Sequence, residues 1–338
     1  MKAWRLSDAF GIDRLELDER PDPALGAREV RVRVNAVSLN YRDILIVDRG
    51  IAPRPVELPL VPCSDAAGAV LEVGPEVARV RVGDRVTTTV FQRWLEGDTI
   101  PEDARDSALG GALDGVLADQ VVLDEDGLVH VPEHLSDDEA STLPCAAVTA
   151  WHALVVKGPV PAGETMLVQG TGGVAIFALQ LGLQAGARVI VTSKSDEKLE
   201  RVRALGAWET INYVTTPDWA ARVLELTGGM GVDHVVEMGG PGTTDQSIQA
   251  ARLGGTVSLI GVLTGLGARI DPHPIAIKGL RIHGIRVGSR AMFEDLNHAI
   301  SANGLRPVID RVFSFDEARE ALRYLQAAEH VGKVVITV

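Results

Sequence analysis

A glycine-rich turn between an apolar strand and a helix is the feature that most constrains this fold. The turn follows the apolar segment 167–169 and consists of Gly170, Thr171, Gly172, Gly173 and Val174. Glycine permits a tight turn and a close approach of backbone N–H groups to phosphate, and the helix N-terminus adds partial positive charge. The turn therefore predicts a site for a dinucleotide pyrophosphate. The alternative is a purely structural turn, since many strand-to-helix turns need glycine for backbone reasons alone.

The end of the next strand, 188–192, indicates which dinucleotide would bind. An NAD site usually presents Asp or Glu about twenty residues after the glycines, where it bonds the ribose hydroxyls. This chain has Ser193 and Lys194 there, with Lys198 one turn further on. A hydroxyl and an ammonium group bind a 2′-phosphate, whereas a carboxylate would repel it. We therefore expect NADP(H), with solvated surface lysines as the alternative.

Composition argues against several classes of partner. The chain of 338 residues has 33 Lys and Arg against 46 Asp and Glu, a formal charge of −13, which disfavours nucleic acid and anionic membranes. It has no apolar run long enough to span a bilayer, and its first residues lack the apolar core of a signal peptide. Its two cysteines, Cys63 and Cys145, favour a reducing compartment. We expect a soluble cytoplasmic protein.

The hydrophobic periodicity changes along the chain and predicts two domains. Residues 29–37, 68–74 and 80–86 suggest short strands of a barrel-like β domain, and 92–118 reads as an irregular excursion. From Ser136 onward, strands alternate with helices, which is typical of a doubly wound parallel sheet.

The predicted strands of that sheet are 165–169, 188–192, 209–213, 233–238, 256–262 and 281–287. A final helix over 315–328 and a strand over 333–338 return to the style of the first domain. We expect a catalytic domain over 1–124, which 288–338 rejoin, and a nucleotide domain over 125–287.

Several separate segments resemble the medium-chain dehydrogenase/reductase superfamily. They are Asn40–Asp43, Pro62–Gly68, Leu143–Trp151, Gln169–Val174 and Gly332–Val335, in the family's order and spread over essentially the whole chain. The resemblance implies an α/β protein in which a Rossmann domain is inserted into a GroES-like, β-rich catalytic domain. It is strongest to the zinc-free, NADPH-dependent branch that contains quinone oxidoreductases and enoyl reductases.

The catalytic zinc ligands of the superfamily are mostly replaced. Zinc-dependent members use a Cys, a His followed by Glu, and a second Cys; the matching positions here are Asn40, Ser64 followed by Asp65, and Cys145. Asn and Ser are poor zinc ligands, and a catalytic site needs three protein groups. The four cysteines of the structural zinc lobe are also missing, and the eight histidines form no recognisable replacement. We therefore expect no metal.

The resemblance assigns the chemistry to Asn40, Tyr41 and Arg42. Asn40 would orient the nicotinamide ribose or the substrate, and the Tyr41 phenol would donate a hydrogen bond or a proton. Arg42 would place a positive charge near the pyrophosphate or a forming enolate. In the alternative interpretation, Tyr41 packs against a cleft wall and Arg42 pairs with Asp43. Asp43 and Asp65 are expected to support these groups.

The resemblance also implies cofactor contacts outside the glycine turn. These are Asn40, Thr149, Tyr213, Gly239, Gly261, Val262, Val287, Gly288, Ser289 and Lys333. Thr149 would lie near the nicotinamide and Tyr213 near the 2′-phosphate, while Lys333 could equally be a solvated lysine.

The implied reaction is hydride transfer from NADPH to a small molecule, either a quinone or an α,β-unsaturated carbonyl compound. Hydrogen-bond donors, without metal, would stabilise the enolate oxygen. The alternatives are a zinc-independent alcohol dehydrogenase or ketone reductase, and an NADPH-binding protein with little turnover. The apolar edge strand 281–287 predicts a homodimer, because relatives pair there.

Overall fold

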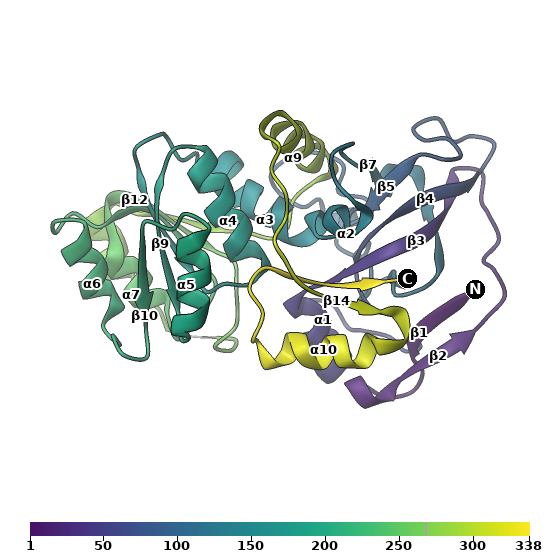
Figure 1. The fold of residues 1–338 in the computed structure, drawn as a ribbon, viewed down its shortest axis with the longest axis horizontal. Helices are drawn as coiled ribbons and strands as arrows, with labels where there is room; N and C mark the ends of the chain where they lie inside the picture. Colours follow the sequence, from purple (N-terminus) through teal and green to yellow (C-terminus); the bar gives the residue numbers. More distant parts are fainter. Residues whose placement is uncertain (268) are drawn as a thin grey trace. The chain divides into compact units, whose positions relative to one another are not determined.

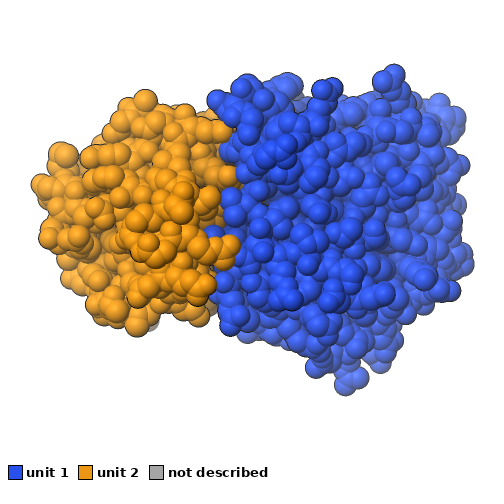
Figure 2. Space-filling model, in the orientation of Figure 1, with its two compact units in different colours: residues 1–148, 287–338 blue, residues 149–286 orange. Residues whose placement is uncertain are grey.

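The computed structural model describes residues 1–267 and 269–338, which form two compact units. Unit 1 comprises Met1–Val148 and Val287–Val338, and unit 2 comprises Thr149–Arg286 (Figure 2). The chain therefore leaves unit 1 once, builds unit 2 and returns.

Unit 1 is built on a seven-stranded sheet (Figure 1). Its order is β14 (Ile309–Ser314), β15 (Lys333–Thr337), β3 (Glu29–Leu39), β4 (Asp65–Val73), β5 (Arg85–Thr88) and β7 (Leu128–His130), with β6 (Gln120–Asp124) also paired to β3. All these pairings are antiparallel except the parallel pair of β14 and β15. A separate hairpin joins β1 (Lys2–Leu6) to β2 (Leu15–Glu19). The alternating residues Val30, Val32 and Val34 of β3 enter the core, as the sequence pattern predicts.

The helices of unit 1 are short or amphipathic. They are α1 (Tyr41–Arg49), α2 (Asp137–Ser141), α9 (Arg290–Asn303) and α10 (Ala318–Ala327). Ser136 caps α2 as predicted, because its hydroxyl accepts from the Glu139 N–H at 3.2 Å and the Glu139 carboxylate accepts from the Ser136 N–H at 2.9 Å. The strand predicted over 80–86 is confined to β5, since Arg81–Asp84 forms a turn with Gly83 at φ 94°.

Residues 125–148 lie in unit 1, whereas the sequence analysis assigned them to the nucleotide domain. β7 pairs with β5, and α2 contacts β3 and β4, so these residues complete the first sheet. The alternation of helices and strands along the chain does not reveal such sheet pairing.

Unit 2 is a doubly wound parallel sheet, which confirms the predicted fold class. Its order is β10 (Glu209–Asn212), β9 (Arg188–Ser193), β8 (Thr165–Gln169), β11 (Val232–Glu237), β12 (Ala251–Leu259) and β13 (Arg281–Gly284). Numbered along the chain from β8, this is 3-2-1-4-5-6, the order of the dinucleotide-binding Rossmann fold. Its helices are α4 (Gly173–Gln184), α5 (Asp196–Ala204), α6 (Trp219–Leu226), α7 (Thr244–Ala250) and α8 (Pro272–Lys278).

The strands of unit 2 lie within a few residues of their predicted positions. The largest differences are β12, which begins at Ala251 instead of 256, and β13, which ends at Gly284 instead of 287. Leu167, Ile190, Val235 and Val257 form the centre of the core. Within the described residues, no helix is both long and apolar enough to cross a membrane.

Candidate active site

Asn40 lies between β3 and α1 and is held by a buried lysine. The antiparallel pairing of β15 with β3 places Val334 opposite Leu39, so Lys333 lies beside Asn40. The Lys333 ammonium donates to the Leu39 carbonyl and to Oδ1 of Asn40, both at 2.6 Å. Lys333 is only 3% exposed, so it is not the solvated surface lysine that the sequence left open.

Asp43, in the first turn of α1, holds the backbone of Asn40 through a hydrogen bond. Its carboxylate accepts from the Asn40 backbone N–H at 2.8 Å and lies 3.4 Å from the Arg42 guanidinium. Burial raises the pKa of Asp43 to about 6, although the charge of Arg42 opposes the rise. The charge of Asp65, a second buried carboxylate, raises the pKa of Asp43 further.

The side chains of Arg42 and Tyr41 have different surroundings in the structure. Arg42 pairs with Asp43 and donates to the Leu109 carbonyl at 3.0 Å, as in the more conservative interpretation. Tyr41 is 38% exposed, which leaves its phenol accessible instead of packed away.

Asp65, the first residue of β4, is fully buried and joins two neighbouring segments. It accepts a hydrogen bond from the Ser64 hydroxyl at 2.5 Å and another from the Cys145 backbone N–H at 2.9 Å. Cys145 belongs to a π-helical stretch, Leu143–Ala147, a geometry that is frequent at functional sites. Thr149 follows on α3 (Val148–Trp151) and is buried.

The donor set at these positions does not fit a zinc ion. Oδ1 of Asn40 already accepts from an ammonium group, and the Ser64 hydroxyl donates a hydrogen bond to Asp65. Cys145 is the one thiol among the three positions, and burial together with the Asp65 charge raises its pKa to about 12. Across residues 1–267 and 269–338, no three His, Cys, Asp or Glu side chains are grouped to hold a metal ion. The residues at these three positions therefore do not form a zinc site.

In unit 2 the glycine turn has the geometry that the sequence predicts. Gly170 has φ 79°, a left-handed conformation that favours glycine, and its N–H donates to the Thr192 carbonyl at 2.8 Å. Gly172 caps α4, which begins at Gly173. Thr171 is buried within the turn.

Four candidate phosphate ligands, Ser193, Lys194, Lys198 and Tyr213, lie at or shortly after the ends of β9 and β10. Ser193 ends β9, and its carbonyl accepts from the Tyr213 N–H at 3.1 Å, while Lys194 follows directly and is exposed. The Ser193 hydroxyl accepts from the Ser195 N–H at 3.3 Å. Lys198 is half-buried in the first turn of α5, where its N–H bonds the capping hydroxyl of Ser195.

A buried carboxylate that the sequence analysis missed organises the end of β11. Glu237 is fully buried and accepts from the Gly239 and Gly240 N–H groups at 2.8 and 2.9 Å and from the Gln169 amide at 2.7 Å. The Thr243 and Ser247 hydroxyls donate to it as well. Because Gln169 directly precedes the glycine turn, this network links that turn to the loop with Gly239. An acidic residue that ends an apolar strand and is followed by Met-Gly-Gly could have revealed it.

The remaining candidates lie in turns that follow β12 and β13. A Cβ on Gly261 would lie 1.8 Å from the Met238 carbonyl oxygen, so this close approach requires glycine, and Val262 beside it is half-buried. Val287 has a left-handed φ of 31°, Gly288 packs against Met292, and Ser289 caps α9. These last three candidates belong to unit 1.

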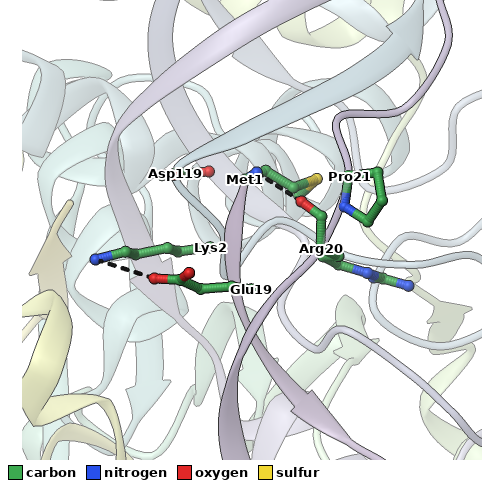
Figure 3. A pocket seen from close by; sticks show the side chains of 6 residues that line it. All are labelled: Met1, Lys2, Glu19, Arg20, Pro21 and Asp119. Atoms are coloured by element: carbon green, nitrogen blue, oxygen red, sulfur yellow. Dashed lines mark hydrogen bonds and ion pairs between the residues drawn. The ribbon is translucent and has the colours of Figure 1, made fainter.

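A surface hollow of about 400 Å³ lies elsewhere in unit 1 (Figure 3). Its lining residues are Met1, Lys2, Glu19, Arg20, Pro21 and Asp119. None of them is a candidate site residue, and the hollow is an open surface feature, so it does not mark the site.

Comparison with known proteins assigns the family. The sequence models for an alcohol dehydrogenase GroES-like domain and a zinc-binding dehydrogenase match residues 26–133 and 173–302. A zinc-type alcohol dehydrogenase-like protein of Schizosaccharomyces pombe is 45% identical, covering 97% of this chain and 96% of that protein. The chain belongs to the medium-chain dehydrogenase/reductase superfamily. A solved structure from Sinorhizobium meliloti 1021 has a TM-score of 0.93 and 44% identity over 100% of this chain and 98% of that one.

Other relatives differ in their named activity and cofactor. A quinone oxidoreductase of Pseudomonas aeruginosa is 31% identical over 96% of both proteins. The structure of an NAD-dependent alcohol dehydrogenase has a TM-score of 0.90 and 33% identity, covering 100% of both chains. That of the 2-octenoyl-CoA carboxylase reductase CinF in complex with NADP and 2-octenoyl-CoA has a TM-score of 0.88 and 26% identity, covering 99% of this chain and 87% of that one. The family therefore shows an oxidoreductase, while cofactor and substrate have to be argued from this chain's residues.

The raised pKa of Asp43 predicts a specific pH dependence of stability. In the unfolded chain Asp43 loses its proton near pH 4, whereas the folded state retains it up to about pH 6. Stability from this group is therefore complete below pH 4 and falls as pH rises through 6. Asp43→Asn removes this titration and can still accept from the Asn40 N–H.

The measurement is reversible urea unfolding of both proteins between pH 4 and pH 7.5. The free energy of unfolding of the wild type, relative to the Asn variant, should fall by roughly 3 kcal/mol over this range, at about 1.4 kcal/mol per pKa unit. A difference that stays constant with pH would show that Asp43 is charged throughout.

Proposed function

We propose that the chain transfers hydride from NADPH to the β-carbon of an α,β-unsaturated carbonyl compound, or to a quinone, without a metal. The observation that carries this proposal is that Asn40, at one of the zinc-ligand positions, is buried and accepts a hydrogen bond from the buried Lys333. A site with amide donors and no Lewis acid suits conjugate reduction, because the negative charge that forms on the carbonyl oxygen is delocalised over an enolate.

Residues of unit 2 support the choice of NADPH. The turn Gly170–Gly173 presents backbone N–H groups and the start of α4 to a pyrophosphate. Four side chains would hold the 2′-phosphate: Ser193, Lys194, Lys198 and Tyr213. Ser193 ends β9, and Lys194 and Tyr213 directly follow β9 and the adjacent parallel strand β10. The nearby Asp196 carboxylate accepts from the Asn212 amide at 2.7 Å. NADPH supplies the hydride, and the CinF complex with NADP shows this cofactor in a relative.

The residues proposed to act in catalysis belong to unit 1. The hydride forms the new C–H bond at the β-carbon, and the electron pair of the C=C bond moves to the carbonyl oxygen as an enolate. Asn40 would donate a hydrogen bond to that oxygen, and a proton from Tyr41 or from water would complete the α-carbon. Arg42 adds positive charge, although Asp43 and Leu109 already hold its guanidinium.

We also propose that a second copy of the chain covers the end of the unit 2 sheet. β13 is the last strand on that side, and an open edge invites strand pairing. Ile277 on the neighbouring α8 is 68% exposed, which adds an apolar surface beside the edge.

Hydride transfer from NADPH deuterated at C4 tests the reaction and its position. With an aryl enone, we expect deuterium at the β-carbon of a saturated ketone, measured by mass spectrometry and NMR of the product, and with a quinone we expect hydroquinone. Deuterium at the carbonyl carbon of a simple ketone, without turnover of enones or quinones, would establish the alcohol dehydrogenase alternative. Tight NADPH binding without any turnover would indicate a non-catalytic protein.

The 2′-phosphate site predicts a change in cofactor preference. In the double variant Ser193→Asp, Lys194→Ala, the new carboxylate repels the phosphate and the ammonium is lost, so the NADPH-to-NADH ratio of kcat/KM should fall about 100-fold. That corresponds to roughly 3 kcal/mol, the value of one or two hydrogen bonds to charged groups. Steady-state kinetics with both cofactors measure the ratio.

The matched control for lost positive charge is Lys2→Ala, a substitution at an exposed lysine of unit 1. It should leave the ratio unchanged. The phosphate site would lie elsewhere if the double variant kept the wild-type ratio.

A further inference from the structure

We propose that Lys333 is a positioning residue that turns Asn40 into a polarised hydrogen-bond donor for the oxygen on which negative charge develops. This inference deepens the proposed function and rests on it. It assigns Lys333 to Asn40, whereas the family resemblance implied a contact with the cofactor.

The chemistry of the two groups fixes the orientation of the Asn40 amide. An ammonium group has three donors and no acceptor, so the atom that faces Lys333 Nζ at 2.6 Å must be the amide oxygen. Nδ2 of Asn40 is thereby directed away from Lys333. Its contact with the Ser38 carbonyl is long, 3.5 Å, and uses one of its two hydrogens. At least one N–H is therefore available to a ligand.

The ammonium itself is held firmly in place. The Leu39 carbonyl accepts from it at 2.6 Å, and Leu39 is paired with Val334 across β3 and β15. A buried ammonium is stable only when it is paired or hydrogen-bonded, and Lys333 donates to both the Leu39 carbonyl and Oδ1 of Asn40. Its positive charge also lowers the pKa of the Asp43 carboxyl.

This arrangement strengthens the donor at the far end of the amide. A charge-assisted hydrogen bond to Oδ1 draws electron density from the amide nitrogen, so its N–H groups become better donors. The positive charge thus acts on an enolate oxygen through the amide. Since the donor is oriented before the substrate arrives, little reorganisation is needed when the enolate forms.

A double-mutant cycle of Lys333→Met and Asn40→Ala measures whether Lys333 acts through Asn40. Loss of one oxyanion donor costs on the order of 100-fold in rate, so we expect Lys333→Met to lower kcat for an aryl enone roughly 10- to 100-fold. In the Asn40→Ala background, the same substitution should cost less than about 3-fold, because the group it acts through is gone. The dissociation constant of NADPH, measured by fluorescence, should stay within about 3-fold of the wild type.

A series of para-substituted aryl enones adds a readout that a structural role would not move. With a weaker donor, the rate of Lys333→Met should depend more steeply on electron withdrawal by the substituent than the rate of the wild type. The matched control is Lys278→Met: the Lys278 ammonium bonds the carbonyls of Ile248, Gln249 and Ala251 in unit 2. This control should lose stability and keep the wild-type slope.

An NMR measurement tests the effect of Lys333 on the Asn40 amide and does not require turnover. The Asn40 side-chain amide, identified in ¹⁵N NMR by its loss in Asn40→Asp, should move upfield in Lys333→Met and stay in place in Lys278→Met. An unmoved resonance, equal costs of Lys333→Met in both backgrounds, or a loss of NADPH affinity as large as the loss of kcat would overturn the positioning role. A wild type that reduces no enone or quinone would instead refute the proposed function, and the amide shift would still decide the role of Lys333.

Discussion

The pairing of β15 with β3 is the constraint on which the candidate site depends. This pairing joins the last strand of the chain to one of the first, and its register places Lys333 beside Asn40. Nearly three hundred residues separate the two side chains in sequence, yet two hydrogen bonds of 2.6 Å fix their relation. A shift of one residue would turn Lys333 to the other face of the strand. The register therefore determines the contact between Lys333 and Asn40 as well as the stability of the sheet.

Charge balance explains how unit 1 tolerates this cluster. Two buried carboxylates, Asp43 and Asp65, lie near two cationic side chains, Arg42 and Lys333. Backbone N–H groups of Asn40 and Cys145 satisfy further lone pairs of the carboxylates. Lys333 also places a positive charge directly beside Asn40, one of the positions that match the zinc ligands of the superfamily.

Much of the fold could be predicted because residues that are neighbours in the sequence determine its turns, caps and strands. The turn at Gly170, the cap at Ser136 and the strands β8 and β9 each follow from neighbouring residues. The contacts that define the site could not be predicted in this way. The Lys333–Asn40 pair and the network around Glu237 arise from strand register and from burial, which bring distant polar groups together. A lone lysine before a strand looks the same in sequence whether it is solvated or buried.

Metal content and activity, measured on the same protein, decide whether the chain's own hydrogen-bond donors replace a metal. Protein purified without added zinc, and then treated with a strong chelator, should contain far less than one zinc per chain. It should reduce enones with NADPH at the same rate before and after chelation. One zinc per chain, with activity lost on its removal and restored on its return, would show that catalysis depends on the metal.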